Sequence, residues 1–206
     1  MENLPFDLTN IDADEVHALE DTFKLLKAKF RVSVSEDTTF DIRQFDLFNN
    51  QTDISIGGTL LINHPESGCY LHFLKILTKV LNGRGPAISY YKYQVWASAT
   101  LRNNFGKLVI RRETVVDKII NLVHPTELHF KDDPIFSKKI NVVADDKDKA
   151  ARSMTKAFRN VLLEISRADW HIEIINSSLI IGSIQPIDSK QTVLLAEVAG
   201  KLSRVK

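Results

Sequence analysis

The stretch HIEIINSSLIIGSI, residues 171–184, decides the fold class. Two runs rich in Ile and Leu lie on either side of Asn176-Ser177-Ser178, and β-branched residues around such turn formers predict a β-hairpin. Asn49-Asn50-Gln51, and Asn103-Asn104 with Gly106, predict two further hairpin turns. Because hairpins dominate and strands do not alternate strictly with helices, the sequence predicts an α+β fold, in which three or four helices pack on an antiparallel sheet.

The other strands are expected where β-branched and aromatic residues cluster between turn formers. They cover residues 31–35, 40–48, 52–62, 88–101, 107–112 and 140–144. Within the third of these, Gly57-Gly58 predicts a β-bulge or the close approach of another backbone, because glycine leaves room for both.

Helices are expected where apolar residues recur every three or four positions. They cover residues 12–30, 64–81, 114–123, 147–166 and 188–205. Asp12 and Asp188 each stand three residues before Glu15 and Gln191, which is the spacing of a helix-capping box. We expect the apolar stripes of the first and last helices to face the core. The alternative is an exposed seam between the helices of a dimer.

Aspartates also mark the boundaries of the second half of the chain. Asp145 or Asp146 is expected to cap the helix over 147–166, because a short carboxylate side chain accepts hydrogen bonds from the first free amides. Asp133-Pro134 is expected to keep residues 124–141 mostly irregular, since the residue before a proline disfavours the helical conformation.

The composition is that of an ordinary globular protein. Of 206 residues, 44% are hydrophobic and 26% charged, so global disorder is excluded. We expect a single domain over 1–206, with a loose subdivision near 113–125 as the alternative. Cys69 is the only cysteine, which excludes an internal disulfide and a CxxC site, and we expect a buried apolar residue rather than a reactive thiol.

No targeting or membrane segment is evident in the sequence. The first ten residues, MENLPFDLTN, contain no basic residue and no long apolar run, so they do not resemble a signal peptide. The most apolar stretch, 70–81, is too short and too charged to cross a bilayer. We therefore expect a soluble, cytoplasmic protein without membrane insertion.

Charge is unevenly distributed although the net charge is only +1. Residues 67–112 contain eight Lys or Arg and no acid, with aromatic residues interleaved, whereas residues 1–21 contain seven acids and no Lys or Arg. Basic groups with aromatic rings suit nucleic acid or other phosphate-bearing ligands. We favour neutralisation of this basic segment by the acidic N-terminal segment of the same or a second copy. The residues of the candidate binding surface are Tyr90, Lys92, Trp96, Arg111 and Arg112.

Catalytic motifs are missing from the sequence. GxSxG, HExxH, GxxxxGK[ST] and GxGxxG do not occur, and we expect no catalytic residue and no cofactor. Imidazole and carboxylate groups in HPTELHFKDD, residues 124–133, could ligate a transition metal. We expect no metal there and keep one weak alternative, a site formed by His124, His129, Asp132 and Asp133.

The second half of the chain resembles a family of uncharacterised bacterial proteins. The resemblance rests on DDPIFSKKINVVADD at 132–146, a following helix, the strand pair at 170–184 and a terminal helix, and it covers about residues 113–200. Members often carry membrane segments ahead of a soluble α+β domain. The resemblance implies that fold and no particular chemistry, and the membrane segments have no counterpart in this sequence.

Three functions therefore remain open. The leading hypothesis is a non-catalytic binding or scaffolding module for an unknown protein partner or for self-association as a dimer. The first alternative is a binder of nucleic acid or another phosphate-bearing ligand through the basic segment 67–112. The second is a small metal-dependent enzyme.

Overall fold

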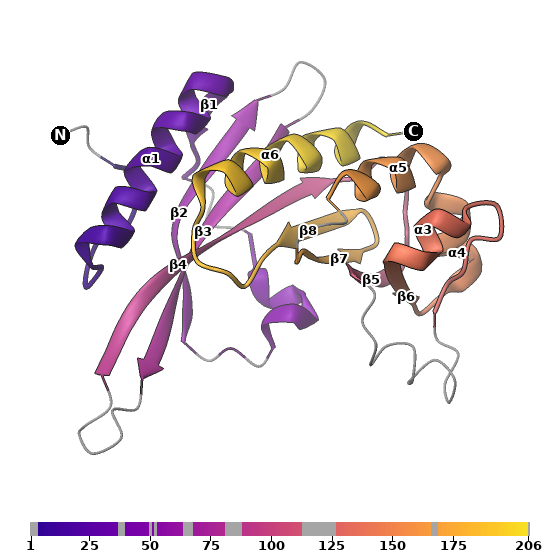
Figure 1. Ribbon diagram of the computed structural model, residues 1–206, viewed down its shortest axis with the longest axis horizontal. Coiled ribbons are helices and arrows are strands. Elements are labelled where there is room, and N and C mark those ends of the chain that lie inside the picture. The colour runs from indigo at the N-terminus through magenta and orange to yellow at the C-terminus, as the bar shows by residue number, and fades with distance from the viewer. Residues whose placement is uncertain are drawn as a thin grey trace.

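Eight strands of the described residues form one sheet, which confirms the predicted α+β fold (Figure 1). The computed structural model describes residues 4–36, 40–49, 51, 53–63, 68–80, 88–112, 127–165 and 169–205. Every strand pair is antiparallel, and the order across the sheet is β1-β2-β3-β4-β8-β7-β5-β6. The strands are β1 Arg31–Val34, β2 Ile54–Asn63, β3 Gly68–Val80, β4 Ile88–Thr100, β5 Lys107–Arg112, β6 Ile140–Ala144, β7 His171–Ile175 and β8 Ser178–Gly182.

Helices cover the sheet on both faces. The described residues contain five α-helices, close to the three or four expected, and two short 3-10 helices. The α-helices are α1 Ala13–Lys29, α3 Pro134–Lys139, α4 Lys147–Ser153, α5 Lys156–Glu164 and α6 Ser189–Arg204, and the 3-10 helices are η1 Ile42–Gln44 and η2 Asp46–Phe48. Figure 1 shows α6 running across the long strands beside α1.

Alternation along the central strands divides the core into two layers. Phe73 and Tyr93 point to what we call the helix face, where they join a core that contains residues of α1 and α6. Leu74 and Trp96 point to the opposite side, which we call the η face, and pack there with residues of η1 and η2. Side chains two apart in a strand therefore belong to one face, and this places the strand residues of the candidate site.

Several sequence predictions are confirmed. Asp12 and Asp188 cap α1 and α6 by accepting from the amides of Glu15 and Gln191. The buried residues on the apolar stripes of these helices show that both stripes face the core, and they include Leu19, Phe23, Leu26, Leu195, Val198 and Leu202. The strand over 140–144 and the β7–β8 hairpin are present. Asp146 caps α4.

The glycine pair in β2 has both predicted properties. The strand register shifts between Ile56 and Gly58, which marks the bulge. A Cβ atom on Gly58 would lie 2.6 Å from the carbonyl oxygen of Pro5, so another backbone does approach closely. A Cβ atom on Gly57 would lie 2.0 Å from the Tyr93 hydroxyl, so only glycine fits beneath that ring.

The helix predicted over 64–81 is wrong, because residues 68–80 form strand β3. This strand is central and both of its faces are covered, so Leu71 and Phe73 pack on the helix face while Leu74 packs on the η face. A strand buried on both sides carries a nearly continuous apolar run, and such a run also satisfies a helical spacing.

The strand predicted over 40–48 is also wrong. This segment forms η1 and η2, so Asn49 and Gln51 do not connect two strands. Glu173 on β7 is fully buried, and its two carboxylate oxygens accept from the amides of Asp46 and Leu47 at the start of η2. The segment is therefore fixed by a residue more than a hundred positions away in the chain.

The turn at 103–106 does not close a hairpin, because β5 pairs with β6 and β7 rather than with β4. The connection instead crosses the end of the β7–β8 hairpin, where Leu101 and Phe105 donate to the carbonyls of Ser177 and Asn176. Gly106 has φ of 72° in this crossing, a conformation that glycine adopts without strain.

The remaining corrections concern residues 127–165. The helix predicted over 147–166 is divided into α4 and α5 at Met154, and Thr155 caps the second part. Asp133-Pro134 begins a helix, α3, rather than preventing one. Proline has no backbone N–H, but the first turn of a helix leaves its N–H groups without a partner inside the helix, so no helical hydrogen bond is lost. The helix predicted over 114–123, the subdivision near 113–125 and His124 lie outside the described residues.

Within the described residues, no helix is long and apolar enough to cross a membrane.

Candidate functional site

A cavity of about 480 Å³ opens on the η face above β2, β3, β4 and β8. Thr59, His72 and Ser98 form part of its floor, because alternation turns these three side chains toward the η face. The segment that carries η1 closes one side. The aromatic residues of its wall are Phe40, Phe45 and Tyr70, and its further polar residues are Ser35, Gln44, Thr100 and Ser178.

His72 lines the cavity and is 1% exposed. Its Nε2 lies 2.8 Å from the hydroxyl of Ser98, and its Nδ1 lies 3.2 Å from the hydroxyl of Thr59. The Phe40 ring stacks on the imidazole at 3.9 Å between centroids and 9° between planes. On the same face the Tyr70 ring is nearly parallel to the imidazole, with centroids 6.3 Å apart. The imidazole is therefore fixed in position as well as buried.

Sequence reasoning missed this site because it assigned residues 64–81 to a helix. If β3 had been predicted as a strand, Tyr70, His72 and Leu74 would have shared one face. A histidine between an aromatic and an aliphatic residue on that face would then have marked a buried polar group that needs hydrogen-bond partners.

The predicted binding residues do not form one contiguous surface. Trp96 is 1% exposed, its ring meets Phe48 edge-on at 4.8 Å, and it covers the Cα of Gly182. Trp96 is thus a core residue, since strand alternation turns it under η2. The register places Arg111 three strands from Trp96, about 14 Å away at the usual strand spacing.

The other predicted binding residues lie on two strands. Lys92 lies near Tyr90 on β4, with its ammonium group 5.4 Å from the ring centroid. Arg111 and Arg112 are exposed on β5, and β8 and β7 separate that strand from β4. Binding of nucleic acid or phosphate by these residues stays a prediction.

The acidic N-terminal segment does neutralise part of the basic segment. The buried ammonium group of Lys75 lies 2.7 Å from the carboxylate of Asp7 and 2.5 Å from the carbonyl oxygen of Thr9. The hydrogen bond from Lys75 lowers the pKa of Asp7 to about 2. Tyr93 adds two contacts to this segment, because its hydroxyl donates to the Asp7 carbonyl and its amide donates to the carboxylate of Glu15.

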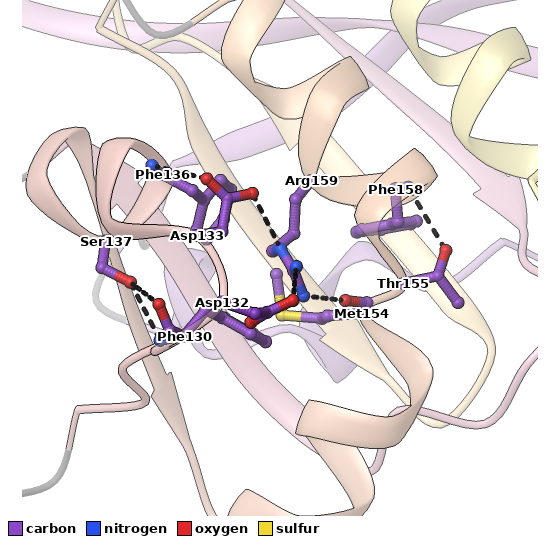
Figure 2. Close-up of polar contacts among 9 residues, drawn as sticks. All are labelled: Phe130, Asp132, Asp133, Phe136, Ser137, Met154, Thr155, Phe158 and Arg159. Atoms are coloured by element: carbon purple, nitrogen blue, oxygen red, sulfur yellow. Dashed lines mark hydrogen bonds and ion pairs between the residues drawn. The ribbon is translucent and has the colours of Figure 1, made fainter.

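The carboxylates of the alternative metal site, Asp132 and Asp133, are bound by an arginine (Figure 2). Arg159 is 4% exposed; its Nη2 lies 2.6 Å from Asp132 and its Nε lies 3.2 Å from Asp133. The guanidinium group also donates to the Met154 carbonyl and lies 4.3 Å from the centroid of the Phe130 ring. The carboxylates therefore compensate a buried cation, as a salt bridge that joins α3 to α5.

The histidines of that alternative metal site do not complete it within the described residues. His129 is largely exposed, and its Nε2 lies 3.5 Å from a carboxylate oxygen of Glu127. His124 lies outside the described residues. In the part of the chain that the structure describes, no three His, Cys, Asp or Glu side chains are grouped as metal ligands.

Cys69 is buried, as expected. Its Sγ lies 3.6 Å from the carbonyl oxygen of Ala196, and burial raises the pKa of the thiol to about 12. The thiolate is the reactive form of cysteine, so this thiol is unreactive at neutral pH.

Comparison with known proteins gives one distant likeness. The chain matches no family model and no curated protein. Among solved structures it is similar to the crystal structure of the mycobacterial trehalose monomycolate transport factor A, TtfA. The identity is 8%, the match covers 89% of this chain and 91% of that one, and the TM-score is 0.49. At these values the likeness carries no argument about function.

Proposed function

We propose that this protein is a non-catalytic binding module that holds a small ligand in the cavity above His72. The observation that supports the proposal is a half-open cavity of about 480 Å³ with a rigidly held, buried histidine in its floor. Ligand sites typically enclose roughly 300–1,000 Å³ and combine aromatic walls with a few fixed polar groups. The cavity has this size and this lining.

The rest of the molecule supports a rigid site. The floor belongs to central strands with a neighbour on each side, and the wall segment is fixed by Glu173, whose carboxylate holds the start of η2. A preformed site avoids the loss of conformational entropy that ordering a loop around a ligand would cost. This rigidity suits binding of a ligand.

A filling variant tests the proposal. Ser178 lies at the exposed end of β8 and lines the cavity, so Ser178→Trp should occupy it. Ser55 is an exposed serine of β2 that does not line the cavity, so Ser55→Trp is the matched control. The probes are small single-ring compounds, toluene, benzyl alcohol and benzamide, observed by saturation-transfer NMR with the full chain.

We expect at least one probe to bind the wild type and Ser55→Trp and to lose binding in Ser178→Trp. Binding that persists in Ser178→Trp would place the probe elsewhere and contradict the proposal. Absence of binding by all three probes to the wild type would also contradict it.

A further inference from the structure

Three side chains from three adjacent strands form a hydrogen-bonded row in the cavity floor. Thr59 on β2 stands directly opposite His72 on β3, and their side chains are 3.2 Å apart. Ser98 on β4 is the diagonal neighbour of His72, since it pairs with Tyr70, and its hydroxyl is 2.8 Å from the imidazole. We call this set the Thr-His-Ser row.

The row presents one hydrogen-bond donor and one acceptor to the cavity. A neutral imidazole has one N–H and one lone pair, and each hydroxyl can donate and accept. If Nδ1 carries the proton, the Thr59 hydroxyl accepts from it and can donate to a ligand. In the same tautomer the Ser98 hydroxyl donates to Nε2 and can accept from a ligand. The other tautomer reverses both roles. In the described part of the chain, no second hydrogen bond is made by either hydroxyl.

The described residues of the remaining lining carry no charged side chain. The polar side chains that the described residues contribute beside the row are hydroxyls and the amide of Gln44. A carboxylate or ammonium group that enters the site loses hydration and meets no opposite charge among these described side chains, which is costly. An uncharged polar group with a donor and an acceptor loses less, because the row replaces its water contacts.

We propose that the cavity takes an uncharged ligand with a flat apolar part and a polar end that both donates and accepts, such as an amide or an alcohol. The polar end bonds to the Thr-His-Ser row, and the flat part lies against the rings of Phe40, Phe45 and Tyr70. This inference rests on the proposed function and adds the chemical class of the ligand to it.

A matched series of single-ring probes tests the ligand class. Benzamide and benzyl alcohol carry the required polar end, benzoate and benzylammonium are charged, and toluene has no polar end. Affinities are measured by competition in saturation-transfer NMR at about pH 7.5, where the carboxylate and the ammonium are ionised. We expect benzamide and benzyl alcohol to bind at least about tenfold more tightly than the other three, the effect of one well-made hydrogen bond near the upper end of its range.

Two buried serines provide the matched variants. Ser98→Ala removes one end of the row, and we expect it to weaken benzamide about tenfold while toluene binding is unchanged. Ser203→Ala removes a buried hydroxyl of α6 that donates to the Gly200 carbonyl, and it should change neither affinity. Thr59→Val tests the other end of the row and serves in place of Ser98→Ala if circular dichroism shows that variant to be unfolded.

The outcomes separate the ligand class from the binding function. Benzoate that binds more tightly than benzamide would make the row a charged anion site and overturn the ligand class, although the cavity would still bind. Toluene that binds as tightly as benzamide would show that the row contributes nothing to affinity. This too would overturn the ligand class and leave the cavity as a binding site. If no probe binds the wild type, the binding function itself fails.

Discussion

Replacing Arg159 with methionine should destabilise the protein by about 3 kcal/mol or more. The guanidinium group is 4% exposed and has two carboxylate partners. Most of the lost stability comes from Asp133, because its side chain is 11% exposed and would become a buried charge without a counter-ion. Asp132 is 67% exposed, so water compensates it.

Urea unfolding followed by circular dichroism measures the free energy of unfolding of each variant. Asp132→Asn should cost about 1 kcal/mol or less, because an exposed ion pair contributes little. Arg152→Met replaces an exposed arginine of α4 and is the matched control, with an expected change within about 0.5 kcal/mol. Adding Asp133→Asn to Arg159→Met should recover part of the loss, since it removes the uncompensated charge.

A loss of less than about 1 kcal/mol for Arg159→Met, or a loss equal to that of Arg152→Met, would contradict a stabilising role for this buried ion pair. It would mean that the two aspartates are not held by Arg159, and they would again be available to the alternative metal site.

Three further predictions concern Gly57 in β2, the Asp7–Lys75 pair and Cys69. Gly57→Ala should cost about 1–3 kcal/mol in urea unfolding, because the new Cβ meets the buried Tyr93 ring, and an unchanged midpoint would contradict the packing. The pKa of Asp7 is lowered to about 2 from 3.8, so the Asp7–Lys75 pair stabilises the fold above pH 3.8, and this stability is lost as the pH falls toward 2. Lys75→Met should remove that part of the acid dependence, which unfolding measured across this pH range would show; an identical acid dependence in the variant would exclude the pair as its source. Cys69 should react with a thiol reagent in urea and only slowly in the native protein, because burial keeps the thiol protonated, and fast native labelling would contradict its burial.

Elements determined by near neighbours in the chain were predictable from the sequence. Asp12 and Asp188 cap their helices through amides three residues ahead, and Asn176 turns the β7–β8 hairpin with φ of 59°. Each of these features needs only a few consecutive residues, so spacing and turn chemistry suffice to identify it.

Elements determined by distant residues were not predictable in this way. Strand β3 has a helix-like apolar spacing and becomes a strand because β2 and β4 pair on both sides of it. Residues 40–48 contain β-forming aromatics but form two 3-10 helices, because Glu173 binds the amides of Asp46 and Leu47. Tertiary contacts override local propensity in both cases.

The candidate site belongs to this second class. His72 and Ser98 are 26 positions apart and meet only through the β3–β4 register. Trp96, which the sequence suggests as an exposed stacking surface, is buried because the same register turns it beneath Phe48. Composition showed that the segment 67–112 is basic and aromatic, but strand alternation decides which of its side chains reach a ligand.

The binding role of the cavity is tested most directly at the imidazole of His72. Nitrogen-15 NMR of the histidine side chains, recorded while benzamide is titrated into the full chain, reports contact with the Thr-His-Ser row. We expect the His72 signals to shift and saturate, those of His171 on β7 to stay in place, and Ser178→Trp to abolish the shift. Unchanged His72 signals at saturating benzamide, or a shift that survives in Ser178→Trp, would contradict it.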